Sequence, residues 1–484
     1  MTTIKLDPGA ALLLDALHGA GHAAYAVGGC VRDSLLGLDP HDWDLCTSAR
    51  PEQVMALFGE EKCIPTGLQH GTVTVKQGGR LYETTTFRTE GAYSDGRHPD
   101  AVCFVPDVRE DLARRDFTIN AMAYSAEEGL IDPFGGRDDL AAHLVRAVGE
   151  PERRFEEDAL RILRLYRFAA RFGFAIDPAT GAAARALGPH LDCVSAERIQ
   201  EELLKLLAAP RPGSYLEPAV LAVILPELEP EKQPERFAEL CRTIDRIEPT
   251  AENVPARLAA LLWPLGEAGA RKALRKLKCS NALTDEVTAL EREAGGGAGS
   301  FLLGHEFELR HPADALCLER HSHPAGRCPN SNSLFPPQAA VVAVAGHSIA
   351  RPIACGNRVP PQRTVLGETP GTPNTTLTVQ AKRLLGRYEL PTIQRLTALC
   401  SARHPEQAGA FAALRAEAER LTAENACCRV SQLAVNGRDL MAAGVRPGPG
   451  LRQVLNALLE AVITGQTPNE KDALLAAAAQ FSAS

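Results

Sequence analysis

The sequence predicts an α/β region at the N-terminus followed by an all-helical remainder. Strand-like apolar runs alternate with helix-like segments over roughly the first 150 residues, and beyond that point apolar positions recur at helical spacing. With 484 residues the chain is too long for one hydrophobic core, so we expect about three or four domains.

The composition indicates a soluble globular protein, with 45% hydrophobic and 23% charged residues and a net charge of -8. The longest apolar run, residues 339–345, is far too short to span a bilayer, and the N-terminus lacks a signal pattern. Thirteen cysteines without CxxC spacing favour reduced thiols. We therefore expect a cytoplasmic protein with no membrane contact, in which any nucleic-acid binding depends on local basic patches.

Residues 25–44, YAVGGCVRDSLLGLDPHDWD, follow an apolar helix predicted at 8–19. The glycine pair after the strand-like run 23–27 allows a sharp turn close to a ligand, and Arg32 at the start of the next helix suits a phosphate. Asp42 and Asp44 are two residues apart, so on an extended strand both carboxylates share a face. This pattern indicates Mg²⁺ and phosphoryl transfer, although either half alone is also common as an ordinary turn or cap.

The next elements continue the α/β pattern. A helix is predicted from about Pro51, and residues 72–76 and 81–87 form a predicted hairpin around the turn 77–80. Glu83 in the second strand is either a further carboxylate near the metal or a solvent-facing edge residue. Residues 89–106 are polar and glycine-bearing, which predicts a loop.

A double arginine lies in DLARRDFTINAMAY, which starts at Asp111. Arg114 and Arg115 precede a helix-like segment, and cations oppose the dipole at a helix start, which favours a binding role for them. Their guanidinium groups suit a triphosphate. A strand at 145–148 then ends the α/β region, with a domain boundary expected at 146–152.

The segment FEEDALRILRLYRFAARF, from Phe155, predicts a helix with charges every three residues and a buried side. The charged residues are Asp158, Arg161, Arg164 and Arg167, and the buried side contains Leu160, Leu163, Phe168 and Ala169. A salt-bridged surface helix is one interpretation. In the other, Asp158 and Arg161 recognise the base edge of cytosine and adenine, which present an amino group beside an acceptor, and reject uracil and guanine.

Several ordered motifs resemble one family: GGCVRD, DWD, YETTTFRTEG, RRDFTINAMA, DPFGG and EDALRILRLYRF. Together they look like a class II tRNA nucleotidyltransferase of the poly(A) polymerase superfamily, a CCA-adding enzyme. The resemblance is dense over residues 20–210, including the neck-like VSAERIQEELLKLL, and looser over 276–289. It returns from Leu433 in a segment similar to the tail of bacterial members.

The resemblance implies a domain order. We expect a nucleotidyltransferase head with a mixed sheet and flanking helices at 1–148, and a helical neck with the base-reading helix at 149–210. A helical body at 211–293 and a helical, tRNA-binding tail at 381–484 complete the order. The intervening stretch, 294–380, matches neither the family nor a packed domain.

The resemblance also implies site residues and a reaction. Gly29 and Arg32 would hold the nucleotide phosphates, Asp42 and Asp44 the Mg²⁺, and Arg115 the nucleotide. Asp158 and Arg161 would read the base, assisted by Arg164 and Arg167. The expected reaction is attack of a tRNA 3′-hydroxyl on the α-phosphate of CTP or ATP, releasing pyrophosphate, with no protein partner implied.

Other activities stay open. The loop at 91–99 is intact, which favours complete addition of C, C and A over addition of CC or A alone. A poly(A) polymerase shares the head motifs, and a non-catalytic or damaged RNA-binding relative is a hypothesis of another class. A basic cluster in the body is a candidate for tRNA phosphates; it includes Lys272, Arg275 and Lys276, with Arg271 and Lys278 beside them.

The stretch 294–380 has an unusual composition. Residues 311–375 contain ten prolines, three acidic residues and no lysine, and helical periodicity returns only at 381–385. The stretch is either a disordered insertion or a segment translated out of frame between two compensating shifts. Its Cys and His residues match no common zinc spacing: Cys317, His321, His323 and Cys328.

Overall fold

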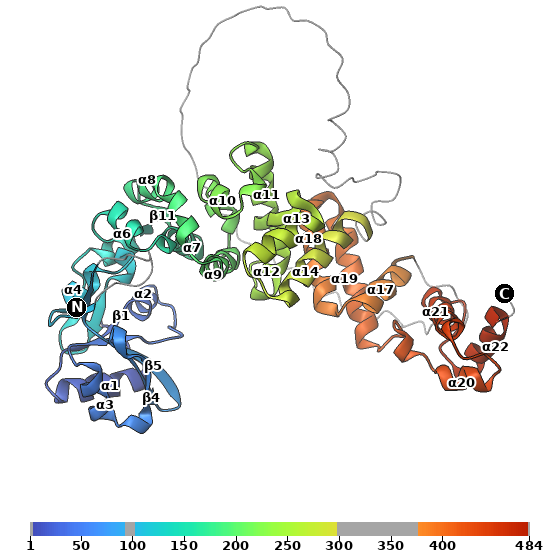
Figure 1. Cartoon of the computed structure of the whole chain (residues 1–484), viewed down its shortest axis with the longest axis horizontal. Helices are drawn as coiled ribbons and strands as arrows, with labels where there is room; N and C mark the ends of the chain where they lie inside the picture. The colour runs from blue at the N-terminus through green and yellow to red at the C-terminus, as the bar shows by residue number, and fades with distance from the viewer. Residues whose placement is uncertain (1–2, 92–101, 298–375, 483–484) are drawn as a thin grey trace, which may run out of the picture. The chain divides into compact units, whose positions relative to one another are not determined.

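The computed structural model describes residues 3–91, 102–297 and 376–482 (Figure 1). The chain divides into two compact units, residues 1–313 with 384–425, and residues 314–383 with 426–484. Most of the loop predicted at 91–99 lies outside the described residues. So does the stretch 294–380 except for its two ends, and so do its four Cys and His residues.

A seven-stranded sheet forms the N-terminal part of the first unit, in the order β3-β4-β5-β2-β1-β8-β9. Only β2 and β5 pair in parallel, which confirms the expected mixed sheet. The strands are β1 (Ala24–Val27), β2 (Leu45–Thr47), β3 (Cys63–Gly67), β4 (Thr72–Gln77), β5 (Arg80–Thr86), β8 (Ala123–Ser125) and β9 (Gly129–Ile131). Two smaller pairs join β6 (Arg88–Glu90) with β7 (Val102–Phe104) and β10 (Leu144–Val145) with β11 (Ala175–Ile176).

The predicted hairpin is present as β4 and β5, which pair from Thr72 opposite Thr85 to Gln77 opposite Arg80. Its two-residue turn consists of Gly78 and Gly79, both with positive φ, as tight hairpin turns require. Local sequence therefore suffices to set this register.

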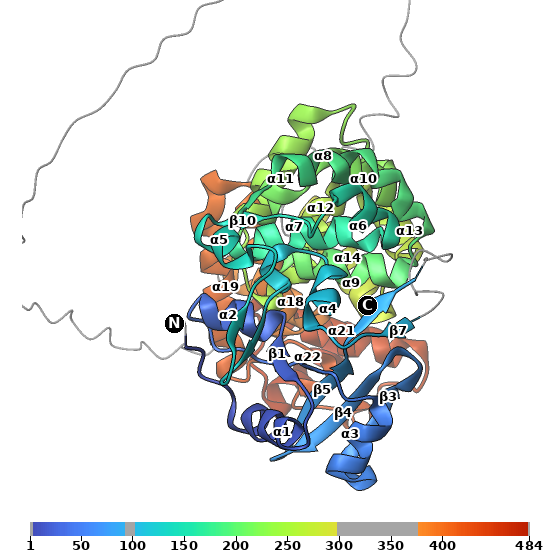
Figure 2. The same cartoon turned by 90° about the vertical axis from the view of Figure 1, so that its left-hand side faces the viewer.

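Short helices flank the sheet (Figure 2). α1 (Pro8–Gly19) and α3 (Pro51–Phe58) pack against each other and against β1, β2 and β4, while α2 (Gly29–Leu35) packs on β1. α4 (Val108–Ala113) and α5 (Gly136–Ala141) complete this region. One buried cluster joins strands to α4; it contains Tyr25, Val27, Cys46, Phe87, Val108, Leu112, Ala121, Ala123 and Val148.

The rest of the first unit is helical, as predicted. Its helices are α6 (Pro151–Glu157), α7 (Leu160–Phe172), α8 (Pro178–Ala186), α9 (Ala196–Leu207), α10 (Pro218–Ile224), α11 (Pro234–Arg246), α12 (Val254–Leu262), α13 (Gly266–Lys276), α14 (Asn281–Arg292), α18 (Leu390–Arg403) and α19 (Ala408–Ala423). A π-helical turn, η9 (Glu293–Gly297), follows α14. α18 packs against α11, α12 and α14, although about a hundred residues separate α14 from α18 in sequence.

The second unit contains three helices after residue 426, namely α20 (Gly437–Ala442), α21 (Pro449–Thr464) and α22 (Lys471–Ser482). Their shared core consists of Val435, Leu440, Val454, Leu458, Val462, Leu474 and Ala478. α17 (Thr376–Arg387) starts five residues before the predicted return of helical structure at 381. In the described part of the chain, none of the helices has the length and apolar character needed to cross a bilayer.

Three local predictions were wrong. β2 begins at Leu45, so Asp42 and Asp44 precede the strand. The double arginine was expected to precede a helix, but it follows the C-terminus of α4, and only a single turn, η3 (Thr118–Asn120), comes after it. The helix predicted from Phe155 is two helices, because the backbone is extended at Asp158 (φ -148°, ψ 103°).

Candidate active site

A glycine turn connects β1 to α2 at the centre of the sheet. Gly28 has φ +77°, and a Cβ built there would lie 2.7 Å from an Arg115 guanidinium nitrogen. A Cβ at Gly29 would meet only Arg32, at 3.6 Å, which is an ordinary contact. Gly28 is therefore the glycine that the close approach requires, and sequence reasoning had singled out Gly29.

Asp42 and Asp44 flank a buried Trp43, and both are exposed, so they alternate as on a strand even though β2 starts one residue later. The Asp44 carbonyl accepts from the Val27 amide at 3.0 Å, which ties the pair to the end of β1. The Asp42 carboxylate contacts the His41 ring at 2.9 Å.

Partial desolvation by the surrounding protein raises the pKa of the Asp44 carboxyl to about 6; the negative charges of Glu83 and Asp42 add to this rise, and the charge of Arg115 opposes it. Carboxylates whose negative charges lie close together form a donor set that a divalent cation would neutralise. No group of three or more potential metal-binding side chains is found among the described residues, so two carboxylates are the candidate ligands.

Arg114 and Arg115 follow the C-terminus of α4, where cations complement the helix dipole. The two arginines therefore do not oppose the helix dipole, contrary to the prediction. Both contact the buried carboxylate of Asp111, Arg114 at 2.8 Å and Arg115 at 3.5 Å. The Nε of Arg115 is buried and has no partner among the described residues, and its guanidinium lies over Gly28. Arg115 therefore lies beside the glycine turn, and its charge also acts on the Asp44 carboxyl.

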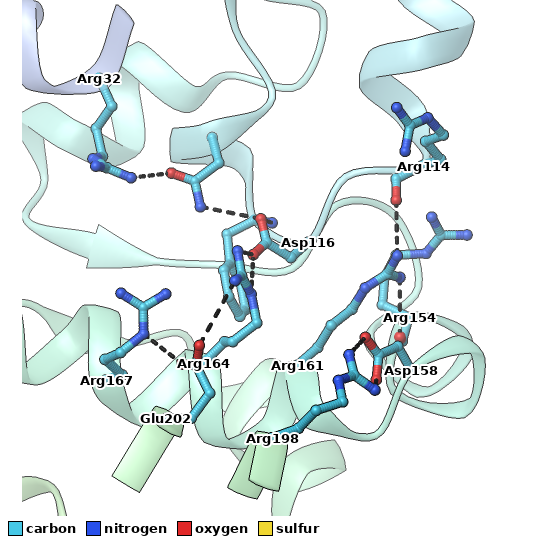
Figure 3. A network of polar contacts seen from close by, with 12 residues as sticks. Arg32, Arg114, Asp116, Arg154, Asp158, Arg161, Arg164, Arg167, Arg198 and Glu202 are labelled. Carbon is cyan, nitrogen blue, oxygen red and sulfur yellow. Dashed lines mark hydrogen bonds and ion pairs between the residues drawn. The ribbon is translucent and has the colours of Figure 1, made fainter. Parts of the chain in front are cut away.

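Arg32, predicted to hold phosphates, is 3% exposed. Its guanidinium donates to Asp33 and to the Asn120 side chain, and lies 5.2 Å from the Phe168 ring centroid and 4.8 Å from that of Phe172. These cation–π contacts connect α2 to α7. Arg32 lies beside the turn, but its visible contacts are with the protein (Figure 3).

Asp158 lies in the extended break between α6 and α7. Its Oδ1 accepts from the Leu160 amide at 3.1 Å and from Arg198 Nη1 at 3.3 Å, and its Oδ2 accepts from Arg198 Nη2 at 2.8 Å (Figure 3). A carboxylate offers about four acceptor positions. One position, on Oδ2, therefore has no donor among the described residues.

Arg161 starts the first turn of α7 and does not bond to the Asp158 carboxylate. Its Nη1 donates to Glu157 at 2.7 Å and to the Arg154 carbonyl at 3.1 Å, and its Nη2 donates to the Arg114 carbonyl at 3.1 Å. In the described part of the chain, Nε–H and one Nη2–H have no acceptor. Nε and Nη2 therefore each keep one N–H that can donate to a ligand.

Arg164 and Arg167 are held by carboxylates. Arg164 donates from Nε and Nη2 to Asp116 at 2.9 and 2.6 Å, and Arg167 donates to Glu202 at 2.5 Å. Both guanidinium groups also lie over the Phe168 ring. The charge of Arg164 and a hydrogen bond from Asn120 hold the pKa of the Asp116 carboxyl well below its ordinary value, although burial opposes this.

Sequence reasoning missed the partners Asp116, Arg198 and Glu202. Asp116 directly follows the double arginine, and the other two lie four residues apart on α9, within the neck-like motif. The sequence contains a signal for this pair. Arg198 and Glu202 are one helical turn apart, and their charges are opposite to those of Asp158 and Arg167, with which they pair.

The basic cluster of the body lies on and just after α13. Arg271 donates to Asp285 at 3.0 Å and to Thr288 at 2.8 Å. The remaining four are exposed and have no ion-pair partner in the described ranges; they are Lys272, Arg275, Lys276 and Lys278.

Three parts of the chain match known families. Residues 24–146 match the poly A polymerase head domain, residues 173–232 the RNA and SrmB- binding site of polymerase A, and residues 392–478 tRNA nucleotidyltransferase domain 2. The chain is 32% identical to the CCA-adding enzyme of Lactiplantibacillus plantarum, over 96% of this chain and 93% of that protein.

Two further comparisons agree. The CCA-adding enzyme of Leuconostoc citreum is 44% identical over 252 residues, which span 52% of this chain and 60% of that relative. A crystal structure of the Bacillus stearothermophilus CCA-adding enzyme in complex with CTP has a TM-score of 0.68 and 30% identity, and the match covers 98% of each chain.

The mixed sheet with its glycine turn and exposed carboxylates, followed by a guanidinium-lined helix, defines a nucleotidyltransferase with a poly A polymerase head. Enzymes of this class generally use a divalent metal. The chain belongs to the CCA-adding enzymes, which are tRNA nucleotidyltransferases.

Proposed function

We propose that the protein adds C, C and A to the 3′ end of tRNA from CTP and ATP without a nucleic-acid template. The tRNA 3′-hydroxyl attacks the α-phosphorus of the nucleotide, and pyrophosphate leaves. The observation that carries this proposal is that Asp158 has one open acceptor position and Arg161, three residues later, has two open N–H donors.

Base selection follows from these open positions. The exocyclic amino group of cytosine or adenine donates to Oδ2 of Asp158, and the adjacent ring acceptor receives an N–H from Arg161. Uracil and guanine would place a carbonyl against the carboxylate and leave a buried acceptor unpaired. Arg164 and Arg167 assist by fixing α7 against the head through Asp116 and against α9 through Glu202.

The phosphate end is assigned to the turn after β1. Gly29 and Arg32 lie on α2 beside it, and Arg115, with an unpartnered buried Nε among the described residues, provides a cation over Gly28. Asp42 and Asp44 would hold Mg²⁺, with Glu83, whose charge acts on Asp44, as a further carboxylate. Bound Mg²⁺ would lower the pKa of the attacking hydroxyl and neutralise charge on the phosphates.

We also propose the domain roles. Catalysis belongs to the head at 1–148, base reading to the neck at 149–210, and tRNA contact to the body at 211–293 and the tail at 381–484, with Lys272, Arg275 and Lys276 meeting tRNA phosphates. The proposed compartment is the cytoplasm. All ten cysteines in the described ranges are free, which supports a reducing environment.

The test uses a tRNA transcript that lacks its 3′ CCA, incubated with Mg²⁺ and with CTP, ATP or both. We expect two C residues with CTP alone and the full CCA with both nucleotides. Long A tracts on unrelated RNA would instead identify a poly(A) polymerase. Binding of tRNA without incorporation would identify a non-catalytic relative.

Asp42→Ala should abolish incorporation, because one of the two proposed metal ligands is lost, while tRNA binding measured by gel shift changes less than about twofold. Asp39→Ala is the matched control, since Asp39 is an exposed aspartate three residues earlier. Near-normal turnover by Asp42→Ala would overturn the metal assignment.

A further inference from the structure

Helix α9 carries two charged residues, and each pairs with residues of opposite charge in the segment 158–167, which contains the proposed base-reading residues. Arg198, in its first turn, holds Asp158, and Glu202, one turn later, holds Arg167 and lies 3.9 Å from Arg164 (Figure 3). α7 and α9 pack against each other, and Ile199 and Leu203 of α9 are buried. Packing of the two helices therefore sets the positions of these pairs.

The pair of Asp158 and Arg198 is two-pronged and mostly shielded, with the side chains 16% and 21% exposed. Each carboxylate oxygen accepts from a different guanidinium nitrogen, and Oδ1 also accepts from the Leu160 amide. This arrangement fixes the plane of the carboxylate and leaves Oδ2 as the oxygen with an open acceptor position. A single ammonium could not fix that plane.

The open donors of Arg161 explain why the Asp158 carboxylate has to be held by Arg198. These donors are Nε–H and one Nη2–H of Arg161, and the Arg161 backbone amide bonds the Asp158 carbonyl at 3.0 Å, so a freed carboxylate of Asp158 would have those donors within reach. A direct pair between Asp158 and Arg161 would occupy both the acceptor and the donors that a base needs. In the structure the two side chains stay unbonded, with Asp158 directed to Arg198 instead.

We propose that Arg198 is a specificity-determining positioning residue, which keeps the carboxylate of Asp158 off Arg161 and aims its one open acceptor position at the amino group of the incoming base. The inference rests on the proposed function, because it needs the chain to select cytosine and adenine. Arg198 acts through Asp158 and does not itself touch the nucleotide.

The experiment measures kcat and KM for CTP and for UTP on a tRNA transcript lacking CCA, for the wild type and for Arg198→Ala. We expect KM for CTP to rise about tenfold, kcat to change less than about twofold, and the ratio of kcat/KM for CTP over UTP to fall about tenfold. Arg198→Lys keeps the charge and the stem but loses the two-pronged geometry, so it should give intermediate values and tests the idea even if Arg198→Ala unfolds.

Two further variants sharpen the test. Adding Arg198→Ala to Asp158→Ala should change the CTP-to-UTP ratio less than about twofold, because the residue through which Arg198 acts is already gone. Lys205→Ala is the matched control, since Lys205 forms an exposed ion pair with Glu201 on the same helix.

The outcomes separate the two proposals. If Arg198→Ala and Arg198→Lys lower kcat and leave KM and the ratio unchanged, Arg198 is structural and the inference is wrong. The inference is also wrong if the double variant lowers the CTP-to-UTP ratio by the product of the two single effects, because the two residues would then act independently. Failure of the wild type to incorporate CMP would overturn the proposed function itself.

Discussion

Glu291 is a buried carboxyl with a raised pKa. The side chain, on α14, is 1% exposed, and neither carboxylate oxygen has a hydrogen-bond partner among the described residues. Burial and the charge of Glu267 raise its pKa to about 8, against the opposing charge of Arg403. The group is therefore protonated in the folded protein at neutral pH.

A stability prediction follows. An acid with a raised pKa in the folded state contributes stability below its ordinary pKa, and that contribution is lost as pH rises from about 4.5 to about 8. Glu291→Gln removes the ionisation, so it should raise the free energy of unfolding at pH 8.5 by about 5 kcal/mol at most, with little change at pH 4.5.

Thermal unfolding at both pH values, by calorimetry, checks this, with the exposed Glu227→Gln as control. Parallel pH profiles for Glu291→Gln and the wild type would contradict the assignment.

Single residues also show where sequence reasoning stops. Residues 42, 44, 158 and 161 could be selected from the sequence, because residue type and spacing carry their chemistry. The burial of Arg32 could not, since it depends on Phe168 and Phe172, which lie more than 130 positions away. The extended backbone at Asp158 was missed because an unbroken helical periodicity conceals it.

At the scale of elements, α13 presents its basic cluster on the exposed surface of the body. The exposed cations there have no ion-pair partner in the described ranges, so their charge is available to a polyanion. Arg271 is different, because its guanidinium already bonds Asp285 and Thr288. The phosphate contacts should therefore come from Lys272, Arg275 and Lys276.

Reversing two of these charges, with Lys272→Glu and Lys276→Glu together, should weaken tRNA binding about tenfold or more. Fewer counterions would be released, so the slope of log affinity against log salt should decrease by about 2. Filter binding between about 50 and 200 mM salt measures both quantities. Lys232→Glu, an exposed lysine outside the cluster, is the control, and an unchanged slope in the double variant would remove α13 from the tRNA surface.

Elements formed by neighbouring residues were predicted well, and those that depend on distant partners were not. The β4–β5 hairpin has alternating residues and a Gly-Gly turn, all within sixteen positions. Parallel pairing of β2 with β5 joins residues such as Leu45 and Thr84, which are far apart in sequence, and no local signal encodes it. The double arginine was assigned to the wrong helix end because α4 has only six residues, too few for a clear period.

At the scale of the whole molecule, the helical core of the first unit is complete only when α18 packs against helices that precede residue 298. Ile393, Leu396 and Leu399 of α18 are buried. Arg387 pairs with Glu293 at 2.7 Å, and Arg395 pairs with Glu286 of α14. These contacts do not require a covalent link between the two sides.

Residues 1–297 and 376–484, co-expressed as two separate chains, should therefore copurify as a one-to-one complex. Affinity purification through a tag on the first chain, followed by size-exclusion chromatography, measures this. Leu399→Asp in the second chain should abolish association, because it places a charge in the α18 core. Separate elution of the unmodified chains would show that the contacts are too weak to hold the unit together.

The position of α18 in the sequence also has a consequence during translation, because the ribosome synthesises this helix long after the helices that it covers. α14 ends at Arg292 and α18 at Arg403, so about 110 further residues are made before the helix that covers α11, α12 and α14 is complete. At about 5–20 residues per second this takes roughly 5–20 s. During that interval the apolar faces awaiting α18 stay open, and the nascent body is then most exposed to chaperones and proteases.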